Sequence, residues 1–393
     1  MKIYTDESVW DAALDRIRYI FDEFENIAVS FSGGKDSTVI FNLALIVAKE
    51  KNRLPLPVMF IDQEAEWNAV IRYVRSTMSL SNVKPYWLQI PIKLFNATSY
   101  TNQWLYCWRE GENWMRPKEP DSIHENIYGT DRFHKIFKSW IKHTFKKESI
   151  ALLGGVRAEE SPNRRAGLTT GATYKHVTWG QIVDKKTDQY VFNPLYDWSY
   201  TDIWTAIHKN KWEYCTVYDD FYRYGVAPYK MRISNLHHET AVDQLFYLQE
   251  IEPQTWDALQ TRLGGINQAR QFTRAEMFTV KELPFMFNDW QEYRDYLVDN
   301  LISEEYRARF VDKFKKMDEQ FKHMDNIDDM FKHQVSSVLH NDWEFIKIDN
   351  FLGRPHTINF VKFMNGKEVD WTRPEKDLKY IKPEHRGKPY AVI

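Results

Sequence analysis

Cysteine is scarce in this chain, with 2 among 393 residues. Cys107 and Cys215 cannot build a disulfide framework, and their spacing matches no zinc or iron–sulfur ligand set. Long apolar runs are also missing, so the sequence predicts no membrane span, and the first residues lack the apolar region of a signal peptide. We therefore expect a cytoplasmic protein.

A large excess of charge is absent too, because the formal net charge is only −2. This balance excludes an overall electrostatic attraction to nucleic acid and leaves open a local basic patch. Aromatic residues are abundant instead, at 16% of the chain with 15 Trp. They indicate a core of bulky side chains, or pockets lined by rings.

The most informative stretch is Ser-Gly-Gly-Lys-Asp-Ser at residues 32–37. It lies between a short apolar run, residues 27–31, and a segment with helical spacing of apolar residues, 39–47. Glycines that join a strand to a helix let backbone N–H groups approach an anion at the helix N-terminus. A glycine-rich turn without a ligand is the alternative, but the strand–turn–helix context favours a phosphate site. The side chains that add donors there are Ser32, Lys35 and Ser37.

A second strand is expected at residues 56–61, and Asp62 follows it. Carboxylates at the carboxyl end of a parallel strand lie where open α/β sheets bind ligands. Asp62 is therefore a candidate to read the ribose or adenine, or to hold Mg²⁺ through water. The alternative is that Asp62 caps a helix at about 66–79. A third strand is expected at 85–90.

Two stretches separate the third strand from the fourth. Residues 91–130 form a Trp-rich insertion, which is either a lid or binding loop or a loop packed on its own side chains. Its Arg109, Arg116 and Lys118 either face an anionic substrate or form surface ion pairs. Residues 131–147 predict a helix with a lysine-rich face, which is either solvated or a contact for nucleic acid or a partner.

The fourth strand, residues 149–153, leads into a polar loop at 154–165. In a doubly wound sheet this strand should lie beside the first, which brings Arg157 close to the phosphate loop. A guanidinium group binds phosphate in a bidentate manner and offsets negative charge on a leaving pyrophosphate. A salt-bridged loop is the alternative. Paired strands are expected between 176 and 192.

Residues 32–37 resemble the PP-loop of ATP pyrophosphatases and of the 3′-phosphoadenosine 5′-phosphosulfate (PAPS) reductase family. A second element is similar to that family's G-x-R-x-x-E-S-x-x-R motif, and a third, at 194–204, to its P-L-x-D-W-x-x-x-D-[IV]-W element. The whole chain looks like the DUF3440 branch, with its IbrA-like proteins, which are linked to prophages and gene regulation. The second motif is matched at Gly155, Arg157, Glu160, Ser161 and Arg164.

This resemblance implies a Rossmann-like fold of the adenine nucleotide α-hydrolase type, which binds ATP, or adenylyl sulfate or PAPS, with Mg²⁺. It implies catalytic roles for Lys35, Asp36 and Arg157, and a nucleoside contact for Asp62. It implies a ParB-like partner as well. The metal ligands and the oligomeric state are not predicted. The other residues expected to bind the nucleotide are Ser30, Ser32, Gly33, Gly34, Ser37, Gly155, Glu160, Ser161 and Arg164.

The sequence departs from assimilatory PAPS reductases because no cysteine follows Cys215. We therefore expect cleavage of ATP between its α- and β-phosphates, giving AMP or an adenylylated acceptor plus pyrophosphate. A sulfonucleotide reductase or sulfurtransferase that uses Cys107 or Cys215 is one alternative. A nucleotide-sensing regulator with little turnover, bound to a ParB-like protein or DNA, is another.

The expected organisation has three parts. Residues 1–232 should form an α/β domain around a doubly wound parallel sheet, with 91–130 inserted. Residues 233–342 should be mainly helical. Residues 343–393 should comprise strand-like segments up to 363 and an extended tail.

Overall fold

The computed structural model describes residues 6–95, 104–146, 149–170, 173–184, 188–237, 239–264, 266 and 282–367. The chain forms two compact units, which we call the sheet unit (Met1–Leu94 and Tyr106–Arg270) and the helical unit (Phe95–Leu105 and Gln271–Ile393). The first unit thus continues past the expected boundary at 232. The reason is that the segments after 232 bury Leu248, Trp256 and Leu259 in the core of the sheet unit. These segments are η3 (Glu239–Gln244), α8 (Leu245–Ile251) and α9 (Pro253–Arg262).

The sheet unit contains a six-stranded sheet in the order β3-β2-β1-β6-β8-β7. Five strands are parallel, and β7 runs antiparallel to β8. This confirms the doubly wound fold and the expected pairing of the first strand with the fourth. The strands are β1 (Asn26–Ser30), β2 (Leu56–Ile61), β3 (Val83–Leu88), β6 (Ile150–Leu153), β7 (Gly180–Asp184) and β8 (Gln189–Phe192).

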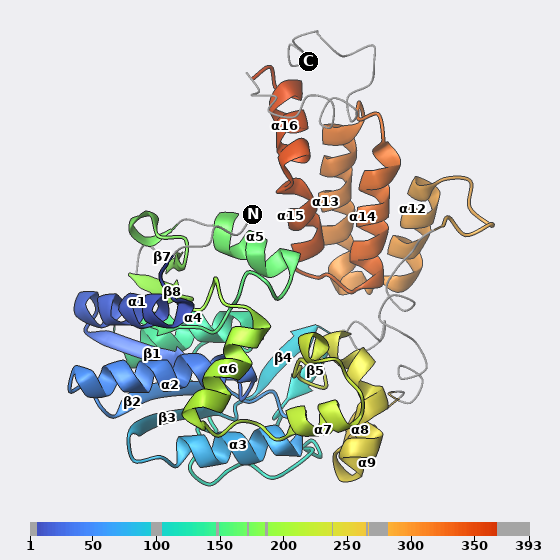
Figure 1. Ribbon diagram of the computed structural model, residues 1–393. Helices are drawn as coiled ribbons and strands as arrows, with labels where there is room; N and C mark the ends of the chain where they lie inside the picture. Colours follow the sequence, from blue (N-terminus) through green and yellow to red (C-terminus); the bar gives the residue numbers. More distant parts are fainter. Residues whose placement is uncertain are drawn as a thin grey trace. The chain divides into compact units, whose positions relative to one another are not determined.

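Helices flank this sheet, and in Figure 1 α1, α2, α3 and α6 cover the face turned to the viewer. The helices of this part are α1 (Val9–Glu23), α2 (Lys35–Glu50), α3 (Asn68–Met78), α4 (Phe133–Thr144), α5 (Pro162–Thr170), α6 (Tyr200–Asn210) and α7 (Val217–Arg223). Short 3₁₀ turns are η1 (Tyr174–His176) and η2 (Pro228–Lys230), and a separate two-stranded sheet pairs β4 (Ile92–Phe95) with β5 (Trp104–Cys107).

The position of β1 determines where a ligand can bind. Residues Ile27–Val29 are buried, as expected for a parallel strand covered on both faces. From β1 the chain moves outward through β2 and β3, and it later returns to place β6 on the other side of β1. Open α/β sheets bind ligands at such a reversal, outside the carboxyl ends of the strands. The carboxyl ends of β1 and β6 therefore define the candidate site.

The helical unit packs its helices around an aromatic core. Phe310, Phe314, Phe321 and Phe351 are buried in this core. The expectation of strands over 343–363 was wrong. Trp343 and Phe345 alternate as in a strand, but Ile348 and Phe351 share one helix face, and a proline begins the next helix. The helices are α12 (Trp290–Leu301), α13 (Glu304–Phe321), α14 (Ile327–Leu339), α15 (Ile346–Leu352) and α16 (Pro355–Met364). The expected tail lies outside the described residues.

Candidate functional site

The predicted phosphate loop joins β1 to α2. Gly33 has φ +71°, and a Cβ there would lie 2.9 Å from Val70 Cγ1, so only glycine fits. Gly34 is the N-cap of α2 and supplies no side-chain cap. Among the described residues, no acceptor is found for the backbone N–H groups of Asp36 and Ser37. This helix N-terminus therefore presents free donors and the positive end of the dipole to an anion.

The polar side chains of the loop are held in place. Ser32 Oγ lies 3.0 Å from Ser37 Oγ, which donates to the Gly34 carbonyl at 2.8 Å. Lys35 Nζ lies 3.0 Å from Asp36 Oδ2 and donates to the Met231 carbonyl at 3.1 Å. Lys35 is buried, so its charge acts in a medium that screens it weakly.

Arg157 reaches the same point from the loop after β6. Its Nε is hydrogen-bonded to Asp36 Oδ1, and its side chain is only 4% exposed. Gly155 makes the approach possible, because a Cβ there would lie 2.9 Å from the carbonyl carbon and oxygen of Asp36. The structure thus brings Lys35, Asp36 and Arg157 together, with one carboxylate between two cations. Their roles in binding or catalysis stay predictions.

The other residues of the second motif line the start of α5. Ser161 Oγ accepts from the Arg164 N–H at 3.1 Å and so caps this helix. Glu160 and Arg164 form an ion pair at 3.3 Å. Partial burial of its carboxyl, followed by repulsion from Asp36, raises the pKa of Glu160 above its ordinary value. Ser30 is the last residue of β1 and is half-buried.

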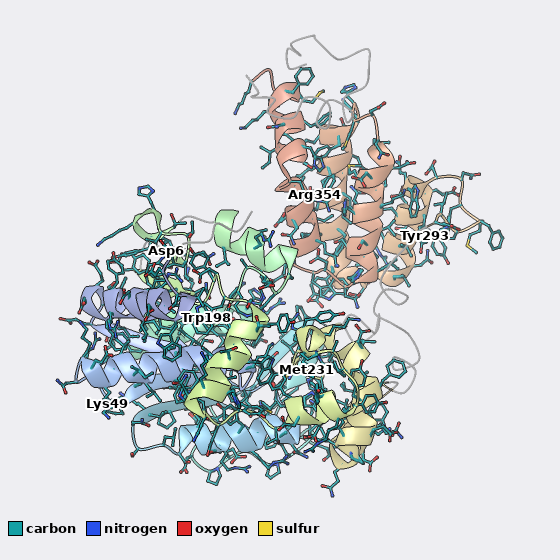
Figure 2. All side chains as sticks on the ribbon, in the orientation of Figure 1. Asp6, Lys49, Trp198, Met231, Tyr293 and Arg354 are labelled. Atoms are coloured by element: carbon teal, nitrogen blue, oxygen red, sulfur yellow. The ribbon has the colours of Figure 1, made fainter. Side chains whose placement is uncertain are left out.

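Tyr218, on α7, is a site residue that sequence patterns do not single out. Its hydroxyl accepts from the backbone N–H of Lys35 at 3.0 Å, and its ring lies 5.6 Å from Lys35 Nζ. Burial raises the pKa of Tyr218 well above its ordinary value, so the hydroxyl stays protonated. Trp198 and Met231, labelled in Figure 2, offer carbonyl groups to Arg157 and Lys35. No local pattern could reveal partners this far along the chain.

Asp62 lies at the end of β2, fully buried, and both its oxygens are engaged. Trp87 Nε1 and Gln89 Nε2 each donate to Oδ2 at 2.9 Å, and Arg116 Nη2 lies 2.5 Å from the same oxygen. Oδ1 accepts from the Glu64 N–H at 2.9 Å. The alternative in which Asp62 caps α3 is wrong, because the N-cap is Trp67. The nucleoside contact stays a prediction.

The insertion is docked on this end of the sheet. Glu64 accepts from the backbone N–H of Trp108 at 2.8 Å and pairs with Arg262 of α9 at 2.7 Å. Gln89 Oε1 accepts from Ser122 Oγ at 2.6 Å. The part of the insertion that belongs to the sheet unit, from residue 106 on, is therefore anchored by buried polar groups that follow β2 and β3. It is packed on them rather than only on itself. The three predicted cations form ion pairs: Arg116 with Asp62, Lys118 with Glu110, and Arg109 with Glu112.

Both cysteines are buried thiols. Cys107 Sγ lies 3.5 Å from His237 Nδ1. Burial raises the pKa of Cys107 well above its ordinary value and lowers the pKa of His237 to about 3, so both are neutral at pH 7. Burial raises the pKa of Cys215 to about 12. Neither thiol has the lowered pKa of a reactive thiolate.

The described residues contain no group of three or more His, Cys, Asp or Glu side chains that could hold a metal ion. They also contain no helix long and apolar enough to cross a bilayer.

On the lysine-rich helix α4, Lys138 pairs with Asp184 at 2.6 Å, whereas Lys135 and Lys142 are exposed. The proposed contact of this helix with nucleic acid stays a prediction.

Comparison with known proteins gives relatives for most of the chain. The protein YbdN of Escherichia coli K12, which is uncharacterized, is 28% identical over 332 residues, 79% of this chain and 80% of that protein. A probable FAD synthase of Schizosaccharomyces pombe is 24% identical over 52% of this chain and 61% of its own length. Sulfate adenylyltransferase subunit 2 of Mycobacterium tuberculosis is 46% identical over 59 residues, 15% of this chain and 19% of that protein.

Solved structures match more distantly. The FMN adenylyltransferase of Candida glabrata is 17% identical, with a TM-score of 0.35 over 55% of this chain and 62% of that chain. A PAPS reductase from Candida auris is 13% identical, with a TM-score of 0.32 over 59% of this chain and 90% of that chain.

Two family profiles together match residues 26–370. The domain of unknown function DUF3440 matches residues 225–370. The phosphoadenosine phosphosulfate reductase domain matches residues 26–228, just over half of the chain and the whole stretch from β1 through α7. The chain therefore belongs to the phosphoadenosine phosphosulfate reductase domain family, in its DUF3440-containing branch.

Proposed function

We propose that this protein binds ATP at residues 32–37 and cleaves it between the α- and β-phosphates. The observation that carries the proposal is the cation pair, Lys35 and Arg157, held on Asp36 at a helix N-terminus with free backbone donors. One relative is named a sulfate adenylyltransferase subunit, and another a probable FAD synthase, so both names refer to an adenylyl or adenine-containing compound. The substrate class is thus an adenine nucleotide.

The proposed reaction follows from the charges around the loop. An acceptor oxygen, or water, forms a bond to the α-phosphorus while the α–β bridging P–O bond breaks. The bond's electron pair leaves with pyrophosphate, and the acceptor loses its proton to solvent. Lys35 and Arg157 offset the charge that grows on the leaving group, and the amides of Asp36 and Ser37 bind phosphate oxygens. Both cations are fixed before the substrate binds, so little reorganisation opposes the reaction.

Magnesium fits this scheme as part of the substrate. Asp36 already has a cation on each carboxylate oxygen, and the described residues offer no cluster of metal ligands. Mg²⁺ in such sites is commonly held by substrate phosphates and water with few protein carboxylates. We therefore propose Mg²⁺·ATP as the substrate, with the metal carried by the phosphates.

Reduction of a sulfonucleotide is the weaker alternative. It needs a thiolate as the nucleophile, and burial raises the pKa of both Cys107 and Cys215. A variant that carries Cys107→Ala and Cys215→Ala separates the two chemistries. Adenylyl cleavage should survive the double substitution, whereas a cysteine-dependent reduction would be lost.

The direct test is to incubate the protein with Mg²⁺ and α-labelled ATP, with and without a ParB-like protein, and to resolve the products. We expect labelled AMP or a labelled adduct, and a loss of about 10²–10³-fold in Lys35→Ala, as when one charge-stabilising group is removed. Lys49→Ala, at an exposed lysine in the last turn of the same helix, is the matched control and should keep full activity. Labelled ADP as the product, or equal rates in both variants, would contradict the proposal.

A further inference from the structure

A cavity of about 430 Å³ lies in the sheet unit, apart from the phosphate loop. One wall is a single face of α3, with Arg72 and Tyr73. The opposite wall is the segment that joins α6 to α7, with Lys211, Trp212 and Tyr214. The volume falls within the range of small-molecule sites, about 300–1,000 Å³. Nothing in the proposed ATP reaction uses this cavity.

The walls of the cavity are fixed by contacts within the protein. Tyr73 donates its hydroxyl to the Glu213 carbonyl at 3.0 Å, which ties α3 to the opposite wall. Tyr214 donates to Asp219 Oδ1 at 2.7 Å. The ring of Trp212 stacks on Trp10 with centroids 5.8 Å apart and planes 24° apart. Three aromatic side chains therefore line a space whose shape exists before any ligand binds, which lowers the entropic cost of binding.

The carboxylates at the cavity have hydrogen-bond partners within the protein, whereas two of its cations have none in the described part of the chain. Asp219 accepts from Tyr214, and Glu213 accepts from Ser76 Oγ at 3.4 Å. By contrast, Arg72 and Lys211 are exposed, and no ion pair or hydrogen bond of their side chains is found among the residues that the structure describes. Arg75, one turn along α3, pairs with Glu119 instead. The cavity thus offers two uncommitted cations beside aromatic rings.

We propose that this cavity binds a small anion that carries a planar ring, such as an aryl or heteroaryl phosphate or carboxylate. The ring lies among Tyr73, Trp212 and Tyr214, and the anionic group is bound by Arg72 and Lys211. A guanidinium group pairs with phosphate and carboxylate through two parallel N–H donors, and aromatic side chains stack on planar rings. The site is separate from the one proposed for ATP.

The cavity also has a short connection to the phosphate loop. The hydroxyl of Tyr73 lies 3.1 Å from Thr38 Oγ1, and Thr38 Oγ1 donates to the Gly34 carbonyl at 3.0 Å. Tyr73, which lines the cavity, is therefore two hydrogen bonds away from Gly34, the N-cap of α2.

The test uses the full chain and phenyl phosphate, the smallest probe that has both features. Binding is measured by ligand-observed NMR and titration calorimetry at millimolar probe. We expect one saturable site, with affinity at least about 10-fold lower in Arg72→Gln and in Lys211→Gln, as for loss of one charge-assisted pair. Lys209→Gln, at an exposed lysine of α6, is the matched control and should bind as the parent does.

Three results would overturn the proposal. The first is the absence of saturable binding. The second is equal affinity for inorganic phosphate, which would mean that the rings contribute nothing. The third is loss of binding in Lys35→Ala with retention in Arg72→Gln, which would place the probe on the phosphate loop. Lys35→Ala also tests the proposal for ATP. The two proposals can therefore be contradicted independently of each other.

Discussion

At the scale of single residues, the site depends on how closely two backbones approach. Gly155 lets the loop after β6 touch the first turn of α2, and this contact delivers Arg157 to Asp36. A carboxylate between Lys35 and Arg157 also offsets the repulsion between the two cations. Small changes of geometry here should therefore act on nucleotide binding before they act on the fold.

Gly155→Ala tests this directly. Its Cβ would lie 2.9 Å from the Asp36 carbonyl, closer than real Cβ atoms come, so the loop must move away from α2. We expect ATP affinity to fall by at least about 10-fold, with a loss of stability of about 1–3 kcal/mol from overpacking. Gly167→Ala is the control, because a Cβ there has no neighbour within 4 Å. That variant should bind ATP normally; equal behaviour of the two variants would refute the argument.

Glu66 gives a pH dependence of stability that can be isolated. Burial raises the pKa of Glu66 to about 8, and Asn235 Nδ2 donates to it at 3.0 Å. The folded protein thus retains a proton that the unfolded chain releases near pH 4.5. Since the native state binds more protons in this range, this group's contribution to stability falls as pH rises from about 4.5 to 8, by at most about 1.4 kcal/mol per unit.

Glu66→Gln removes the titration and keeps an oxygen for Asn235. Urea unfolding at several pH values between 5 and 8 should show that the parent loses stability relative to this variant as pH rises. Parallel curves for the two proteins would show that Glu66 does not retain the proton.

At the scale of elements, the end of β2 supports the Trp-rich insertion. Asp62 and Glu64 are both fully buried, and they bind Arg116 and Arg262, which come from the insertion and from α9. A buried ion pair contributes little net stability while intact, but removal of one partner leaves the other charge uncompensated. Removal of either Asp62 or Glu64 should therefore weaken the packing of the insertion on the sheet unit.

Asp62→Ala is expected to destabilise the sheet unit by about 3–5 kcal/mol, because Arg116 stays buried without its carboxylate. Limited proteolysis should then cut within residues 104–123, where the parent resists. Asp121→Ala removes an exposed carboxylate of the same insertion and should leave the pattern unchanged. Resistance to the protease in Asp62→Ala would show that other contacts suffice to hold the insertion.

At the scale of the whole molecule, the chain passes between the two units three times, after residues 94, 105 and 270. The helical unit is thus built from two separate segments, and Trp104 of the shorter one packs against its aromatic core. A substitution that destabilises this core should therefore also destabilise the structure of the residues around Trp104.

Phe310→Ala should cost the helical unit about 3–5 kcal/mol, since Phe310 is fully buried. Hydrogen–deuterium exchange should accelerate in peptides from α13 and around Trp104, while β1 stays protected. Val311→Ala, at a neighbour that is 48% exposed, is the control and should change neither. Unchanged exchange around Trp104 in Phe310→Ala would contradict this account.

Sequence patterns predict those features that depend on neighbours along the chain. The phosphate loop, the strand beside it and the approach of Arg157 follow from local motifs and the rules of parallel sheets. The contact of Tyr218 with the loop joins residues 183 apart, and no local signal encodes it. Sequence patterns do not reveal the pairing of Asp62 with Arg116, because Arg116 lies in an aperiodic stretch. The wrong prediction of strands at 343–363 arose from a local pattern that was misleading. Short helices with a few aromatic residues can show the same alternation as a strand.

The close approach at Gly155 also has a genetic consequence. At Gly180, an added Cβ would meet the ring of Phe192 and Cγ2 of Val177, so smaller side chains at 192 and 177 relieve the clash. At Gly155 the obstacle is the backbone carbonyl of residue 36, which is present whatever amino acid stands there. No single substitution at position 36 removes that obstacle. A selection for restored function should therefore recover second-site suppressors of a substitution at Gly180. For a substitution at Gly155 it should recover only reversion to glycine.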